Sequence, residues 1–187
     1  MAMTLNGDFG GTFPFEPRYL DAGEIKLHYV DEGPRDSAPL LFAHGNPTWS
    51  YLWRRQIAEL SSRGHRCIAF DHMGFGRSDK PPQLSAYSLE RHVANALALI
   101  DELDLADVTL VAHDWGGPIG LGAMVERSDR LRALVLMNTW AWELPSFLPP
   151  FLRSSAPRAS ARSSPWAATC SSSRSRAACT GATSTPP

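Results

Sequence analysis

The sequence predicts an α/β fold in which a mostly parallel β-sheet is covered by helices on both faces. Short apolar runs alternate along the chain with longer segments of helical spacing, which is the order of successive strand and helix units. Several of these runs are apolar at every position, as in strands whose two faces are both buried. Ligand-binding residues are therefore expected at the carboxyl ends of the strands, where such sheets form their sites.

The elements can be assigned in chain order, beginning with a β-hairpin. Two extended runs, residues 16–20 and 24–30, flank a turn in which Gly23 suits the tight bend. Gly64 is expected to end the first helix, and Ser88 is a candidate N-cap of the second. After the hairpin, strands are predicted at 38–45, 65–71, 107–115 and 131–138, with helices at 53–64, 88–105 and 117–128.

Composition favours a chain that acts on small molecules. With 43% hydrophobic residues and a net charge of -1, it offers no bulk charge that would attract nucleic acid or an anionic membrane. The start has no basic segment before an apolar core, and no run of about 18 apolar residues occurs, so a cytoplasmic location is expected. The three cysteines show neither disulfide nor metal spacing, and Cys67 is expected to be a small core residue of a strand.

Residues 154–187 differ sharply in composition from the chain before them. Ser, Arg, Ala, Thr and Pro dominate this tail, and it shows no apolar periodicity that could bury a face. A disordered tail is one explanation. Translation in a shifted reading frame after about residue 153 is another, because GC-rich codons read out of frame produce this mixture. Sequencing the gene would separate the two.

The segment 108–121 has the layout of a nucleophile elbow. A strand runs through Ala112 into Asp114 and Trp115, and two glycines then open a helix. In such a turn the side chain at the apex is lifted clear of the sheet, and the amino end of the helix favours a negative charge there. The alternative is that Asp114 is only an N-cap, a common role for aspartate.

Two further segments accompany the elbow, His-Gly-Asn-Pro at residues 44–47 and Phe-Asp-His-Met-Gly-Phe-Gly-Arg-Ser-Asp-Lys-Pro at 70–81. With the elbow, and in this order, they resemble the α/β-hydrolase fold and, within it, the haloalkane dehalogenases, over roughly residues 15–153. The second segment lacks the Lys-Ser/Thr of a phosphate loop, so Asp71 and Arg77 are expected to be structural.

The resemblance implies a role for three residues. Asp114 would be the nucleophile that attacks the carbon bearing the halogen, while Asn46 and Trp115 would bind the halide through side-chain N–H groups. A carboxylate suits this attack because it can form an ester, and neutral N–H donors suit an anion that develops in an apolar pocket. The backbone N–H groups of Asn46 and Trp115 would hold the oxyanion when water hydrolyses the ester.

The sequence departs from the family where the second step needs a general base. The family places this histidine well after the elbow, but no histidine follows His113. His113 precedes the nucleophile and is expected to point away from it. The acid partner is also unplaced: Asn138 fits relatives that take their acid from a later strand, and Glu143 does not match the position. We therefore expect the base and its acid partner to be absent and the chain as written to be inactive in turnover.

By the same resemblance the chain divides into the first part of a hydrolase core, residues 1–139, the start of a cap at 140–153, and the tail at 154–187. Without further strands, residues 131–138 would form an exposed apolar edge that invites aggregation. Trp140 and Trp142 could belong to a substrate pocket or simply pack in a loop.

The remaining histidines are expected in structural positions: His28 and His65 on the surface or in strands, His44 and His72 in loops, and His92 in a helix.

Three functions stay open at this point. The first is hydrolytic dehalogenation of a haloalkane to an alcohol and halide, with water as the second reactant and no metal or other cofactor. The second is an epoxide hydrolase or another hydrolase on the same scaffold, although Asn46 with Trp115 favours the halide. The third is a non-catalytic fragment or pseudogene product. The oligomeric state is not predicted.

Overall fold

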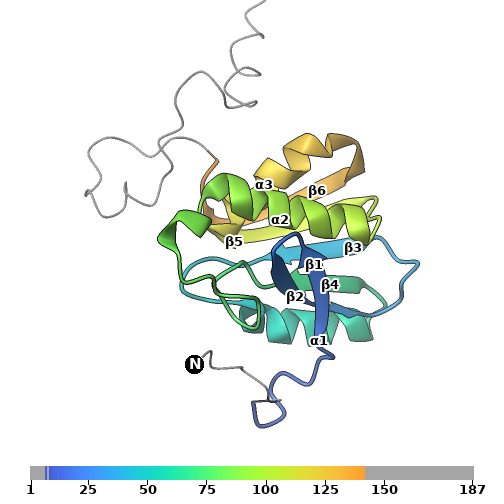
Figure 1. Cartoon of the computed structure of the whole chain (residues 1–187). Coiled ribbons are helices and arrows are strands. Elements are labelled where there is room, and N and C mark those ends of the chain that lie inside the picture. The colour runs from blue at the N-terminus through green and yellow to red at the C-terminus, as the bar shows by residue number, and fades with distance from the viewer. Residues whose placement is uncertain (1–6, 8, 142–187) are drawn as a thin grey trace, which may run out of the picture. The chain divides into compact units, whose positions relative to one another are not determined.

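The computed structural model describes residue 7 and residues 9–141, which form one mixed β-sheet with helices on both faces (Figure 1). The six strands are β1 (Arg18–Ala22), β2 (Ile25–Glu32), β3 (Pro39–Ala43), β4 (Arg66–Phe70), β5 (Val108–Asp114) and β6 (Leu131–Thr139). The helices are α1 (Arg54–Ser62), α2 (Leu89–Glu102) and α3 (Gly116–Glu126), with short 3-10 turns at Ser50–Trp53, Leu84–Ala86 and Ser128–Arg130.

The sheet has the strand order β1-β2-β4-β3-β5-β6. β1 pairs antiparallel with β2 in the predicted hairpin, whose turn contains Gly23 at φ +70°. β2 is also antiparallel to β4, whereas β3 is parallel to both β4 and β5, and β5 is parallel to β6. The predicted mostly parallel α/β sheet is therefore confirmed, with its antiparallel pairings confined to the N-terminal side.

Successive residues of the central strands feed two hydrophobic clusters, one on each face. In β5, Leu110 and Ala112 belong to the cluster that includes residues of α2 and α3, while Val111 packs in the cluster that includes Ile57 of α1. Burial on both faces explains why these strands are apolar at nearly every position. Cys67 of β4 is fully buried, as expected, and burial raises the pKa of its thiol to about 11.

Helix boundaries follow the predicted signals. The hydroxyl of Ser88 accepts the backbone N–H of Arg91 at 3.2 Å and so caps α2. Gly64, at φ +85°, lies just beyond α1, where the left-handed backbone suits a residue without a side chain. Both predictions are confirmed.

β6 forms the outer edge of the described sheet, and it is apolar and open. Leu134, Val135 and Leu136 are 44%, 44% and 47% exposed, whereas most residues of the central strands β3, β4 and β5 are buried. The predicted exposed edge is confirmed. Of the predicted cap region, residues 142–153 lie outside the described residues, as does the tail at 154–187. Within the described part, no helix has both the length and the apolar character needed to cross a membrane.

We expect Leu136→Lys to reduce self-association of the chain, because a charge on an open apolar edge disfavours pairing with another edge. Its thermal stability should change little, since Leu136 is already 47% exposed. Sedimentation velocity over a range of concentrations measures the effect. Leu84→Lys is the matched control: Leu84 is 88% exposed but lies away from the sheet edge. Equal association of both variants and the unchanged chain would contradict the role of the edge.

Candidate active site

The carboxyl end of β5 turns sharply into α3, and Asp114 stands at the turn with φ +53°. This left-handed conformation is uncommon outside glycine, although aspartate tolerates it better than most residues. The two glycines that follow are required by close approach. A Cβ on Gly116 would lie 2.1 Å from the Ala43 carbonyl oxygen, and one on Gly117 would lie 1.7 Å from the Thr139 hydroxyl. The strand, turn and helix of the predicted elbow are therefore present.

Asp114 does not act as an N-cap. Trp115 occupies the N-cap position of α3, and no side chain caps that end. Instead the Asp114 carboxylate reaches the loop after β3, where the backbone N–H of Asn46 donates to Oδ1 with an N···O distance of 2.8 Å. Gly45 makes this approach feasible, because a Cβ there would lie 2.3 Å from the same oxygen. The interpretation of Asp114 as a simple cap is wrong.

The structure brings the three residues implied by the resemblance to one place. Asn46 is exposed and its backbone contacts Asp114 directly, while Trp115 follows Asp114 in the chain and is half-buried. The Trp115 ring packs edge-on against Trp140, with centroids 5.0 Å apart and planes at 74°. Trp140 thus lies beside the elbow, whereas Trp142 and Glu143 lie outside the described residues. Halide binding by the Asn46 amide and the Trp115 indole stays a prediction, as does the second oxyanion donor.

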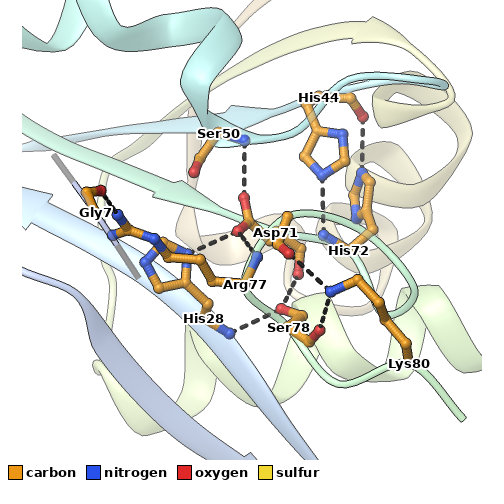
Figure 2. A network of polar contacts seen from close by, with 10 residues as sticks. Gly7, His28, His44, Ser50, Asp71, His72, Arg77, Ser78 and Lys80 are labelled. Carbon is orange, nitrogen blue, oxygen red and sulfur yellow. Dashed lines mark hydrogen bonds and ion pairs between the residues drawn. The ribbon is translucent and has the colours of Figure 1, made fainter. Parts of the chain in front are cut away.

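Two histidines in ring contact, His44 and His72, hold the start of the loop that carries Asn46 (Figure 2). The backbone N–H of His72 donates to His44 Nε2 at 2.9 Å, and His72 Nε2 donates to the His44 carbonyl oxygen at 2.7 Å. His44 Nδ1 in turn donates to the Gly45 carbonyl at 2.9 Å. Each ring therefore donates through one nitrogen only, which is the neutral form. His44 and His72 both lie in loops, as predicted.

The buried carboxylate of Asp71 organises the same region (Figure 2). Its Oδ1 accepts the backbone N–H of Ser50 at 2.8 Å, and its Oδ2 accepts the backbone N–H of Arg77 and the Nδ1–H of His28, each at 2.8 Å. Burial alone would raise the pKa of this carboxyl, but the hydrogen bond and charge of His28, together with the other donors, lower it overall. Asp71 therefore stays ionised and ties three chain segments together, so its predicted structural role is confirmed.

The sequence left open whether His28 lies on the surface or in a strand. It lies in β2, and its side chain is fully buried against Asp71, so the strand alternative is confirmed. Ser78 completes the contact, since its hydroxyl accepts the His28 backbone N–H at 2.8 Å and donates to the Asp71 carbonyl at 2.6 Å. The sequence does not reveal this contact, because His28 and Asp71 are 43 residues apart and no local periodicity joins them.

Three histidines lie in a chain of ring contacts: His44 and His72, which are buried, and His92, which is half-buried. The centroids of His44 and His72 are 4.1 Å apart, and those of His72 and His92 are 5.8 Å apart. Burial, followed by repulsion from the neighbouring imidazoles, lowers the pKa of His72 well below its ordinary value and that of His92 to about 4. Burial also lowers the pKa of His44. Neutral rings make this cluster structural. His65 is exposed, as expected.

The chain is similar to a known protein family and to known enzymes. A family model described as the alpha/beta hydrolase fold matches residues 38–168. A haloalkane dehalogenase of Psychrobacter cryohalolentis is 46% identical over 132 residues, which are 68% of this chain and 44% of that protein. The chain therefore spans about half the length of the curated relatives it matches.

Two solved structures are similar to the described fold. One is a tetrameric haloalkane dehalogenase from Paraglaciecola agarilytica, with a TM-score of 0.70 and 39% identity over 76% of this chain and 50% of that one. The other is an epoxide hydrolase from Vigna radiata, with a TM-score of 0.66 and 34% identity over 76% of this chain and 46% of that one.

We expect Asp71→Asn to lower the free energy of unfolding by about 3 kcal/mol, because it removes a buried charged acceptor of three hydrogen bonds and replaces one oxygen by an NH2 group that faces other donors. Urea unfolding followed by circular dichroism measures this loss. Asp101→Asn is the matched control, since Asp101 pairs with Arg127 on the surface and its loss should cost less than about 1 kcal/mol. Equal effects of the two substitutions would contradict the central role of Asp71.

We expect stability to fall as the pH drops from 6.5 toward about 4, the pKa of His92 in the fold. A pKa lowered by folding means that the unfolded chain takes up protons at a higher pH than the folded chain, so acid favours unfolding in this window. His92→Phe should reduce the slope of unfolding free energy against pH, and His65→Asn on the surface should leave it unchanged. A His92→Phe protein with the original slope would speak against the neutral cluster.

Proposed function

Because this chain belongs to the α/β-hydrolase fold family, we propose that it is the nucleophile-bearing part of a haloalkane dehalogenase. The observation that carries the proposal is the hydrogen bond from the Asn46 backbone N–H to Oδ1 of Asp114 at the elbow. On this proposal the attacking carboxylate already contacts an oxyanion donor before any substrate arrives. The 46% identity to a haloalkane dehalogenase supports the choice of reaction.

In the first step Asp114 attacks the carbon that bears the halogen. A carbon–oxygen bond forms as the carbon–halogen bond breaks, and the halide leaves with the bonding electrons. Oδ1 already accepts the Asn46 N–H. We assign the attack to Oδ2, which accepts none of the hydrogen bonds found among residues 9–141. Oδ1 then becomes the carbonyl oxygen of the ester, still facing its donor.

The departing halide requires donors that carry no charge of their own. The Asn46 side-chain amide and the Trp115 indole are both neutral N–H donors, and both belong to residues at the elbow. We assign them to the halide. The Trp115 ring packs edge-on against Trp140, which restricts the orientations open to the indole.

The second step, hydrolysis of the ester, needs a base that these residues do not supply. No histidine follows His113 in the 187 residues, and the histidine cluster is neutral and committed to structural contacts. We propose that this chain carries the alkylation step and that ester hydrolysis depends on residues outside it. On this proposal residues 1–139 belong to the hydrolase core, residues 140–153 lead into the cap, and residues 154–187 are the tail that differs in composition. The cytoplasmic location expected from the sequence is retained.

An epoxide hydrolase is the second candidate, favoured by the similarity to the Vigna radiata enzyme. The same nucleophile would open an epoxide ring, but no leaving anion would need the amide and indole donors. The nature of the released product therefore distinguishes the two functions.

Incubation with 1-bromobutane should add one butyl group to Asp114 and release one equivalent of bromide. Intact mass, peptide mapping and a bromide electrode measure the two products. Asp114→Ala should abolish both, and Asp36→Ala, at an exposed loop aspartate, should change neither. Trp115→Phe should slow bromide release by about ten-fold or more, because it removes a donor to the developing charge.

Three other results would each redirect the assignment. Labelling of Asp114 by an epoxide with no bromide release from the bromoalkane would favour the epoxide hydrolase. Steady bromide release beyond one equivalent would show that the chain contains a working base. Neither label nor bromide would reject the enzyme and favour the non-catalytic fragment.

A further inference from the structure

The end of β6 contains an irregularity directly opposite the nucleophile. His113 of β5 is in register with Met137, but the next residue, Asp114, is in register with Thr139, so Asn138 is an extra residue in the strand. Asn138 adopts φ +44°, a left-handed conformation that asparagine tolerates and that absorbs the extra residue as a bulge. The bulge brings Thr139, rather than Asn138, beside the elbow.

The Thr139 hydroxyl donates to the backbone carbonyl oxygen of Asp114 at 2.5 Å. In a helix this carbonyl would accept the N–H four residues later, but that residue is Pro118, which has none. The first intrahelical bond nearby instead runs from Ile119 to the Trp115 carbonyl, at 3.3 Å. Thr139 thus supplies the donor that the chain itself lacks at this position.

Space for the hydroxyl exists only because residue 117 is glycine. A Cβ at Gly117 would lie 1.7 Å from the Thr139 oxygen, closer than any real contact. The bulge at Asn138, the missing N–H of Pro118 and the missing side chain of Gly117 all serve one hydrogen bond. That bond holds the backbone of Asp114, which has φ +53°. Thr139 reaches Asp114 from β6, whereas Asn46, whose N–H donates to the Asp114 carboxylate at 2.8 Å, reaches it from the β3 side of β5.

We propose that Thr139 is a positioning residue for the nucleophile, fixing the peptide of Asp114 so that its carboxylate faces the Asn46 N–H and the incoming carbon. The proposal rests on the proposed function, since it assigns Asp114 as the attacking group. Thr139 itself touches only the backbone. Its loss should therefore slow the attack while leaving the binding of the alkyl group unchanged.

The test compares Thr139→Val, which keeps the shape but removes the hydroxyl, with Thr139→Ser, which keeps the hydroxyl. Ester formation on Asp114 is followed by intact mass over a range of 1-bromobutane concentrations. For Thr139→Val the limiting rate should fall about ten-fold or more, because small displacements of a reacting group are costly. The half-saturating concentration should stay unchanged, and Thr139→Ser should recover the rate. A valine variant as fast as the original, or a serine variant as slow as valine, would overturn the proposal.

Two further measurements keep the test decisive. Gly117→Ala removes the space for the hydroxyl without altering Thr139, and it replaces Thr139→Val in the test if the valine variant does not fold. It should slow ester formation in the same way, and an unchanged rate would overturn the proposal. Amide hydrogen exchange at residues 115–117 should be faster in Thr139→Val than in Thr139→Ser. If the original chain forms no ester, the proposed function fails. The exchange comparison alone then decides the role of Thr139, and equal exchange in the two variants would overturn that role.

Discussion

The described fold depends on keeping one charged carboxylate, that of Asp71, ionised in its interior. An unpaired charge at full burial would cost several kcal/mol, so both carboxylate oxygens need hydrogen-bond donors. The donors come from β2 through His28, from the segment after β3 through Ser50, and from the loop after β4 through Arg77. Satisfying one carboxylate therefore fixes three segments that are distant in the chain, at the edge of the sheet where the site forms.

That constraint reaches the nucleophile through the loop after β3. Ser50 lies at one end of this loop, held by Asp71, and His44 lies at the other, held by His72. Asn46 lies between them and presents its N–H to Asp114. Because both ends are fixed by buried contacts, the donor is positioned without a ligand, which is the preorganisation that electrostatic catalysis requires. Burial lowers the pKa of His44 and His72 and so favours their neutral forms. These two rings therefore support the loop without adding charge beside Asp114.

The chemistry that this arrangement supports is the first half of a two-step reaction. The residues proposed for this step lie where β3 and β5, two neighbouring parallel strands, end. They are the proposed nucleophile Asp114, and Asn46 and Trp115, which are proposed to bind the oxyanion and the halide. β6 adds Thr139 from the other side of β5 and is at the same time the open edge of the described sheet. On the proposed function, the groups assigned to the attack all lie in this part of the fold, whereas ester hydrolysis needs a group from elsewhere.

The strands, the helices, the capping Ser88 and the elbow could be predicted from the sequence, because each depends on periodicity or on a short motif. The elbow and the His-Gly-Asn-Pro segment, through the family resemblance, also indicated Asp114, Asn46 and Trp115 as candidate site residues. Only the tertiary structure decided that Asp114 is no N-cap, that His28 is buried against Asp71, and that Thr139 meets the Asp114 carbonyl. These contacts join residues 25 to 68 positions apart. The physical reason is that local patterns report how a segment folds, while hydrogen bonds between strands depend on register, bulges and burial, which no single segment encodes.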